Sequence, residues 1–165
     1  MTNVEIRKIR EEEFTTVSDF LENNGVYNGD FEEHQSNFLL AIFGGDPIGC
    51  ISHKEHDGVV ELRSGAVKEE LRRKHIETKL FKTKMKELEE NGVETIYART
   101  EKRNVASNGL LQSLCFSLIT GNEKYVVSPR CGECQEDYYR MGYCRTYSPD
   151  KKCPFNFYKK RLKQP

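Results

Sequence analysis

The sequence of 165 residues contains no apolar run that approaches the roughly 20 residues needed to cross a membrane. Its first residues, MTNVEIRKIREEE, are charged and lack the apolar centre of a secretory signal peptide. Both absences argue against a membrane or secreted protein. We therefore expect a cytoplasmic protein, in a compartment where disulfides rarely persist.

Net charge is also absent, because 26 lysine and arginine residues balance 26 aspartate and glutamate residues. A neutral chain has no general attraction to nucleic acid or to an anionic membrane, so neither is expected as a partner. No internal repeat and no low-complexity linker interrupts the sequence. Its length suits one hydrophobic core, and we predict a single domain over residues 1–165.

The hydrophobic pattern predicts a mixed α/β sheet. Strands are expected near residues 4–6, 38–43, 48–53, 59–67, 93–100, 116–120 and 155–162, and helices over 14–21, 72–90 and 106–114. The element order is β-α-βββ-α-β-α-β, with a small cysteine-rich insert, residues 121–153, before the last strand. Strand 93–100 should lie parallel to its predecessor because a helix connects the two.

Two stretches of the sequence carry its strongest functional signal. The first, VKEELRRKHIET over residues 67–78, joins a predicted strand to the long helix. The second, NVASNGLLQSLCF over residues 104–116, spans the next helix and the start of a further strand. In this order and at this separation, they resemble the paired signatures of the GNAT N-acetyltransferase family. The resemblance covers about residues 4–120 and the last strand.

The resemblance implies a GNAT-like fold and acetyl-CoA as co-substrate. In the family, one strand splays from its neighbour, and its backbone at the position of Val67 holds the pantetheine arm and the acetyl carbonyl. The next loop, of the type Arg-x-x-Gly-x-Gly, holds the pyrophosphate at a helix start, where free N–H groups favour anions. The cofactor-binding residues carried over by resemblance are Ala66, Val67, Arg72, Arg73, Lys74, His75, Ile76, Glu77, Thr78, Asn104 and Ser107.

Four positions depart from the family pattern. His75 and Glu77 stand where the loop has glycines, Leu111 replaces a tyrosine that often protonates the leaving thiolate, and Cys115 replaces a later glycine. Glu77 would set a carboxylate near the phosphates, where like charges repel, and residues 72–74 could offset that charge. With Leu111 unable to donate a proton, the thiolate would take one from Cys115, a nearby tyrosine or water.

Several of these residues also have simpler interpretations. The basic residues 72–74 are equally typical of a solvated charged turn. Asn104 and Ser107 are residues that cap helices well, with or without a cofactor.

Glu61 is the predicted general base, because its place on the strand is similar to that of the catalytic glutamate in histone-acetylating GNAT members. Period-two alternation would put Glu61, Arg63 and Gly65 on one face. The alternative is a surface glutamate paired with Arg63 or a neighbouring lysine. His53 and His56, near the adjacent turn, are further candidate bases because histidine titrates in the useful range.

Four of the six cysteines lie within 23 residues, spaced Cys131-x2-Cys134-x9-Cys144-x8-Cys153. One C-x2-C knuckle with two later thiols suits tetrahedral, structural zinc, which would stabilise a segment with little apolar surface. Reduced thiols, a redox pair and iron–sulfur ligation are the alternatives. Interleaved tyrosine and basic residues in the insert are also compatible with binding RNA or an acidic protein surface.

Two functions follow from these features. The first is an acetyl-CoA-dependent N-acetyltransferase acting on a primary amine of a small molecule or protein, with the insert shaping the acceptor site. The second is a GNAT-like scaffold that has lost acetyl transfer and binds protein or RNA through the insert. The departures at His75, Glu77 and Leu111 favour the scaffold, and the retained Arg72 and Asn104 favour the enzyme.

Overall fold

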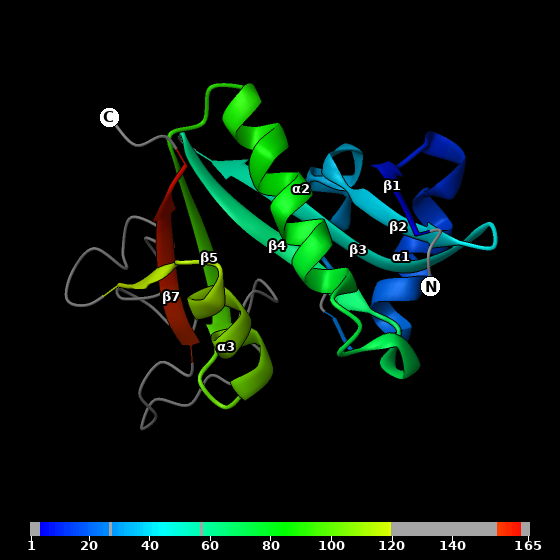
Figure 1. The fold of residues 1–165 in the computed structure, drawn as a ribbon. Coiled ribbons are helices and arrows are strands. Elements are labelled where there is room, and N and C mark those ends of the chain that lie inside the picture. The colour runs from blue at the N-terminus through cyan, green and yellow to red at the C-terminus, as the bar shows by residue number, and fades with distance from the viewer. Residues whose placement is uncertain (1–3, 27, 57, 120–154, 163–165) are drawn as a thin grey trace.

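The computed structural model describes residues 4–26, 28–56, 58–119 and 155–162, which form a seven-stranded sheet with three α-helices (Figure 1). The strands are β1 Glu5–Lys8, β2 Leu39–Phe43, β3 Asp46–His56, β4 Val59–Val67, β5 Thr95–Glu101, β6 Ser117–Leu118 and β7 Phe155–Arg161. The helices are α1 Phe14–Asn23, α2 Ile76–Glu90 and α3 Val105–Ser113. Short 3-10 turns cover Glu11–Glu13, Phe31–Glu33, Gln35–Asn37 and Glu69–Leu71.

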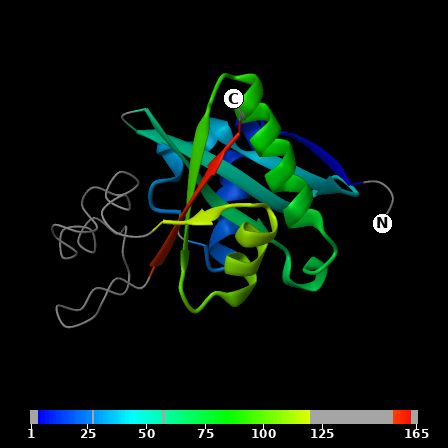
Figure 2. The same ribbon diagram turned by 60° about the vertical axis from the view of Figure 1, so that its left-hand side comes forward.

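The sheet has the strand order β1-β2-β3-β4-β5-β7-β6. Strands β1 to β4 form an antiparallel meander, and β5 joins β4 in parallel, as the connecting helix predicted. The last strand in the chain, β7, pairs antiparallel with both β5 and β6 and runs alongside β5 (Figures 1 and 2). The predicted mixed sheet and its parallel pair are therefore confirmed.

Helices cover both faces of the sheet, with α2 across β3 and β4 on one face and α1 on the other (Figure 1). Successive side chains of a strand point to opposite faces, so β2 contributes Leu39 and Ala41 to the α2 side and Leu40 and Ile42 to the α1 side. On α2 the buried apolar residues recur at helical spacing: Ile76, Leu80, Phe81 and Leu88. No helix among the described residues is long and apolar enough to span a membrane.

Strands β4 and β5 pair along only part of their length. Residues Val60–Leu62 pair with Ile96–Ala98, and no pairing follows although β4 runs on to Val67 and β5 to Glu101. Figure 1 shows the two strands together at one end and separating toward the other. The separation leaves the last residues of β4 without a strand on that side.

A β-bulge in β4 accompanies this separation. Ser52 pairs with Arg63 and Cys50 with Ala66, so two residues of β4, Ser64 and Gly65, oppose one residue of β3. Ser64 has a left-handed φ of 53°. Because of the extra residue, the side chains of β4 after the bulge point to the opposite face from the one that strict alternation predicts. A Cβ on Gly65 would lie 3.5 Å from Phe81, on the α2 side of the sheet. The prediction that Gly65 shares a face with Glu61 and Arg63 is therefore wrong.

The start of α2 also differs from its predicted boundary. The helix begins at Ile76 rather than at residue 72, because Arg73 and His75 have left-handed φ values of 63° and 61°. A right-handed helix cannot run through left-handed residues. Residues 72–75 consequently form a loop that leads into the helix. The predicted insert, residues 121–153, lies outside the described residues.

Candidate active site

The end of β4 presents unpaired backbone toward the gap between β4 and β5. The N–H of Lys68 donates to the carbonyl of Ile48 at 3.0 Å. Hydrogen bonding alternates along an antiparallel pair, so the N–H and C=O of Val67 point away from β3, toward the side that β5 has left. The carbonyl of Val67 accepts one weak side-chain bond, from Nε of Arg72 at 3.4 Å. Val67 can therefore offer both groups to an extended ligand.

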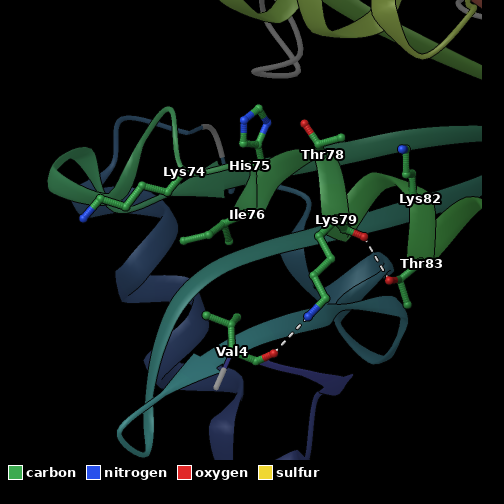
Figure 3. Close-up of a pocket in the computed structure, with 8 residues that line it drawn as sticks. All are labelled: Val4, Lys74, His75, Ile76, Thr78, Lys79, Lys82 and Thr83. Carbon is green, nitrogen blue, oxygen red and sulfur yellow. Dashed lines mark hydrogen bonds between the residues drawn. The ribbon is translucent and has the colours of Figure 1, made fainter. Parts of the chain in front are cut away.

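A hollow of about 510 Å³ lies beside the first turns of α2 (Figure 3). It is lined by Val4, Lys74, His75, Ile76, Thr78, Lys79, Lys82 and Thr83. Three lysines around the positive end of a helix favour an anion. Nζ of Lys79 also donates to the carbonyl of Val4 at 3.1 Å, as the dashed line in Figure 3 marks.

The predicted cofactor residues of this loop have different exposures. Arg72, Arg73, Lys74 and His75 are exposed, Glu77 and Thr78 are half-buried, and Ile76 is buried. The Ile76 side chain packs in the core, so position 76 can give a ligand only its backbone. The first-turn N–H groups of α2 have no side-chain cap from His75, which is the N-cap residue.

Glu77 lies in the first turn of α2 and is half-buried, between the lining residues Ile76 and Thr78 in the chain. Burial raises the pKa of Glu77 above its ordinary value, and the positive charge of Arg72 opposes that shift. The folded protein therefore disfavours the charged form of this carboxylate. A buried anion at this position would also weaken phosphate binding.

The N-terminus of α3 contains the two predicted residues Asn104 and Ser107. Asn104 is the N-cap, and its Oδ1 accepts from the backbone N–H of Ser107 at 3.1 Å. The capping interpretation is thus confirmed, while their contact with a cofactor stays a prediction. Both residues stand just after the end of β5, the strand that borders the gap.

Asn108 is an important residue that the sequence did not single out. Its amide nitrogen donates to the carbonyls of Glu101 at 2.9 Å and Asn104 at 2.7 Å. Its Oδ1 accepts from Nδ2 of Asn156 at 2.9 Å and from the hydroxyl of Tyr158 at 2.6 Å. One buried side chain therefore ties α3 to β5 and β7, and a lone asparagine in a helix gives no sequence signal for that role.

Glu61 is the middle residue of the stretch Val60–Leu62, through which β4 pairs with β5. Its side chain is on the face of the sheet opposite α2. It is 8% exposed, and its carboxylate lies 3.7 Å from Nη1 of Arg63 and 3.4 Å from Nε of Arg99. The predicted pairing with Arg63 is present, yet Glu61 is buried rather than on the surface. Its Oε1 atom accepts no hydrogen bond within the described residues.

A second buried carboxylate, Asp30, lies beside this pair. It contacts Nη2 of Arg63 at 2.9 Å, Nζ of Lys54 at 3.6 Å and Nε2 of His34 at 3.5 Å. Burial opposes ionisation, but His34, Arg63 and Lys54 outweigh it and hold the pKa of Asp30 well below its usual range. Lys54 also pairs with Glu33. Asp30 and His34 come from the loop between α1 and β2, whose sequence carries no recognisable motif.

His53, the alternative base, faces away from Glu61. Burial, together with the nearby charge of Lys84 on α2, lowers the pKa of His53 to about 4. His53 is therefore uncharged at neutral pH, on the α2 side of the sheet, and is a weak base. The side chain of His56 lies outside the described residues.

No metal-binding group of three or more histidine, cysteine, aspartate or glutamate residues occurs in the described part of the chain. The predicted zinc ligands Cys131, Cys134, Cys144 and Cys153 all lie outside it. Their coordination stays a prediction. Of the described cysteines, Cys50 is buried and Cys115 is exposed.

The sequence model of the Acetyltransferase (GNAT) family matches residues 3–116, more than half of the chain. The chain belongs to the GNAT acetyltransferase family. The general activity of this family is acetyl transfer. No curated protein matches the chain in sequence.

Solved GNAT structures share the fold at low sequence identity. A GNAT acetyltransferase from Staphylococcus aureus superposes with a TM-score of 0.70 at 16% identity, covering 98% of this chain and 100% of that one. The ribosomal-protein-S18-alanine N-acetyltransferase of Escherichia coli gives 0.70 at 13% identity, covering 99% and 96%. N-acetylglutamate synthase of Neisseria gonorrhoeae, complexed with coenzyme A and N-acetyl-glutamate, gives 0.69 at 16% identity, covering 99% and 36%. At these identities the likeness establishes the fold alone.

The departures from the GNAT pattern fit the backbone in different ways. His75 and Cys115 stand where the family has glycine, and both keep a left-handed φ of 61°. Leu111, in place of the family tyrosine, is 3% exposed and packs in the α2-side core. The hydroxyl of Tyr158 is buried and donates to Asn108. At His75 and Cys115 the backbone thus has a conformation that glycine adopts readily, although neither residue is glycine.

Proposed function

We propose that this GNAT protein transfers the acetyl group of acetyl-CoA to a primary amine. The observation that carries the proposal is the position of Glu61, a buried carboxylate where β4 and β5 begin to separate. Farther along the same strand, Val67 directs into the gap backbone groups that no strand pairs. A candidate base and a candidate acyl-binding backbone thus lie on one strand, and a base within reach of the attacking amine is what acetyl transfer needs.

The residues around the gap fit acetyl-CoA. Val67 offers a carbonyl and an N–H to the pantetheine arm, and Ala66 continues the strand edge. The first-turn N–H groups of α2 and the exposed side chains of residues 72–74 suit the pyrophosphate. Arg72 would leave the Val67 carbonyl and turn to the phosphates when the cofactor enters.

The proposed reaction proceeds by attack of the amine nitrogen on the acetyl carbonyl carbon, which forms the C–N bond and breaks the C–S bond. Glu61 accepts the proton that the nitrogen loses, directly or through one water. Arg63 and Arg99 lie 3.7 and 3.4 Å from the two oxygens of this carboxylate and hold it in place. The departing thiolate takes a proton from Cys115 or from water, since Leu111 has none to donate.

Glu61→Gln is the decisive variant for this proposal. We expect acetyl-CoA-dependent acetylation of a panel of primary amines, followed as thiol release, to fall by about 10²–10⁴-fold. Calorimetric titration should give an unchanged Kd for acetyl-CoA, because Glu61 lies away from the phosphate-binding loop. Glu32→Gln, an exposed glutamate in the turn Phe31–Glu33, is the matched control and should retain activity. Full activity of Glu61→Gln would exclude Glu61 as the base.

The scaffold function is the alternative, and two observations at the loop favour it. Glu77 places a half-buried carboxylate in the first turn of α2, and Arg72 occupies the Val67 carbonyl. A scaffold that binds protein or RNA through the insert would need no cofactor. Calorimetry separates the two functions, since micromolar binding of acetyl-CoA supports the enzyme and no binding at millimolar concentration supports the scaffold.

For the insert, residues 121–153, we propose a structural zinc ion held by Cys131, Cys134, Cys144 and Cys153. The spacing of the four thiols supports this assignment. The chain also leaves and re-enters the sheet at adjacent strands, where the N–H of Ile119 donates to Phe157 at 2.8 Å. Protein purified without added zinc should contain about one zinc per chain. A content far below that would refute the site.

A further inference from the structure

Arg63 lies between two carboxylates that come from different parts of the fold. Its Nη2 atom is 2.9 Å from Asp30 Oδ2, within hydrogen-bond distance. Its Nη1 atom is 3.7 Å from Glu61 Oε2, too far for a hydrogen bond. One guanidinium thus binds Asp30 tightly and Glu61 only through a loose ion pair.

Asp30 is held where it can act on Arg63. It is 3% exposed and hydrogen-bonded to Arg63, and Nζ of Lys54 and Nε2 of His34 lie 3.6 and 3.5 Å away as looser charge contacts. His34 is itself anchored, because its Nδ1 atom lies 3.2 Å from the hydroxyl of the buried Ser52. The carboxylate of Asp30 therefore has little freedom to move toward or away from Arg63.

Charged groups surround Glu61 on every element packed against it. Arg63 follows it on β4, and Lys54 on β3 and Tyr97 on β5 are its register partners. Arg99 on β5 lies 3.4 Å from its Oε1 atom and also stacks over the ring of Phe155. The α1–β2 loop adds Asp30, Glu33 and His34. The two cations in direct contact with Glu61 are Arg63 and Arg99, and Arg63 also donates a hydrogen bond to Asp30.

We propose that Asp30 is a positioning residue, whose hydrogen bond to Arg63 holds the guanidinium back from full contact with Glu61. The inference rests on the proposed function, in which Glu61 is the general base. A carboxylate in full contact with an arginine is a weaker base than one without that contact. Asp30 would therefore act on the reaction through the position of Arg63.

The test measures the titration of Glu61 itself, so it needs no knowledge of the acceptor. Protein labelled with ¹³C at the glutamate carboxyl carbons is titrated by NMR, and Glu61→Gln identifies the resonance. Asp30→Asn should lower the midpoint of Glu61 by about one pH unit, because it frees Arg63 and removes a neighbouring anion. Arg63→Gln should raise the midpoint by a similar amount, and Glu32→Gln should leave it unchanged.

The double variant Asp30→Asn/Arg63→Gln tests whether Asp30 acts through Arg63. In protein that already carries Arg63→Gln, Asp30→Asn should shift the midpoint of Glu61 by less than half as much as it does in the natural chain. An undiminished shift, or no shift in Asp30→Asn, would overturn the proposal. If Asp30→Asn does not fold, an unchanged midpoint in Arg63→Gln overturns it and a raised midpoint supports it.

A second readout separates this inference from the proposed function. With any amine of the panel that is acetylated, the acid limb of the pH–rate profile should move down in Asp30→Asn and up in Arg63→Gln, with an unchanged Kd for acetyl-CoA. If Glu61→Gln stays active while the NMR midpoints shift as expected, the proposed base is wrong but the electrostatic relation stands. If Glu61→Gln is inactive and the midpoints do not move, only the role of Asp30 is lost.

Discussion

His75→Gly is expected to stabilise the protein and to tighten acetyl-CoA binding at the same time. His75 is the exposed N-cap of α2 with a φ of 61°, at a position where the family has glycine. A left-handed conformation costs an ordinary residue roughly 1–2 kcal/mol. Glycine avoids this cost but loses about 0.5–1 kcal/mol more chain entropy on folding. The net gain in the free energy of unfolding should be about 0.5–1 kcal/mol.

The gain in affinity has a separate cause. Removing the imidazole lets the first-turn N–H groups of α2 approach the pyrophosphate more closely. One additional hydrogen bond to a charged group contributes about 1.5 kcal/mol, which corresponds to roughly tenfold in Kd. Urea denaturation measures the first effect, and calorimetric titration with acetyl-CoA measures the second.

Arg73→Gly is the matched control for this prediction. Arg73 is also exposed and left-handed, with a φ of 63°, but it lies before the helix and contributes no first-turn N–H group. It should gain similar stability, but it should bind acetyl-CoA more weakly, because the Arg73 side chain is one of the proposed phosphate contacts. The reasoning would be refuted if His75→Gly bound acetyl-CoA more weakly than the natural chain, because His75 itself would then contact the cofactor.

Two further predictions concern α2 and α3. Burial raises the pKa of Glu77, so its contribution to stability is full below its ordinary value of 4.5 and is lost as pH rises through the folded value. Glu77→Gln should therefore match the natural chain at pH 4 and exceed it in urea denaturation at pH 8; equal midpoints at both pH values would contradict this. Asn108→Ala should cost roughly 2–4 kcal/mol in unfolding free energy, because it removes the side-chain hydrogen bonds that tie α3 to β5 and β7 and leaves Asn156 and the buried hydroxyl of Tyr158 without this acceptor. Tyr158→Phe should cost about 1 kcal/mol. The cap variant Asn104→Ala should also cost about 1 kcal/mol in unfolding free energy. If Asn108→Ala lost no more than Asn104→Ala, the hydrogen bonds of the Asn108 side chain would not have the importance assigned to them.

Local patterns in the sequence were sufficient for the elements that depend on neighbours in the chain. Alternation located β4 at the predicted residues, and the helix between β4 and β5 predicted their parallel pairing. Asn104 and Ser107 were predicted to cap a helix, and the capping bond that the structure shows joins residues only three apart. These features arise within a few residues of chain, so composition and spacing determine them.

Features that depend on contacts between distant segments were not predictable. The bulge at Ser64 arises from how β4 registers with β3, and it moved Gly65 to the opposite face. The buried role of Asn108 depends on β7, 48 residues later in the chain for its contact with Asn156. Strand and helix periodicities relate residues that are a few positions apart in the chain. They therefore give no sign of a partner this far away.

The sequence by itself determined the family and the order of the elements, since both depend on patterns along the chain. The loop at residues 72–75 was found only in the structure, where Arg73 and His75 have positive φ values. Only the tertiary structure decided that Asp30, a loop residue, binds Arg63 and lies next to Glu61. The physical reason is that the basicity of a buried carboxylate depends on the charges a few ångströms away. Those charges come from β3, β5 and the α1–β2 loop, which meet only when the sheet is assembled.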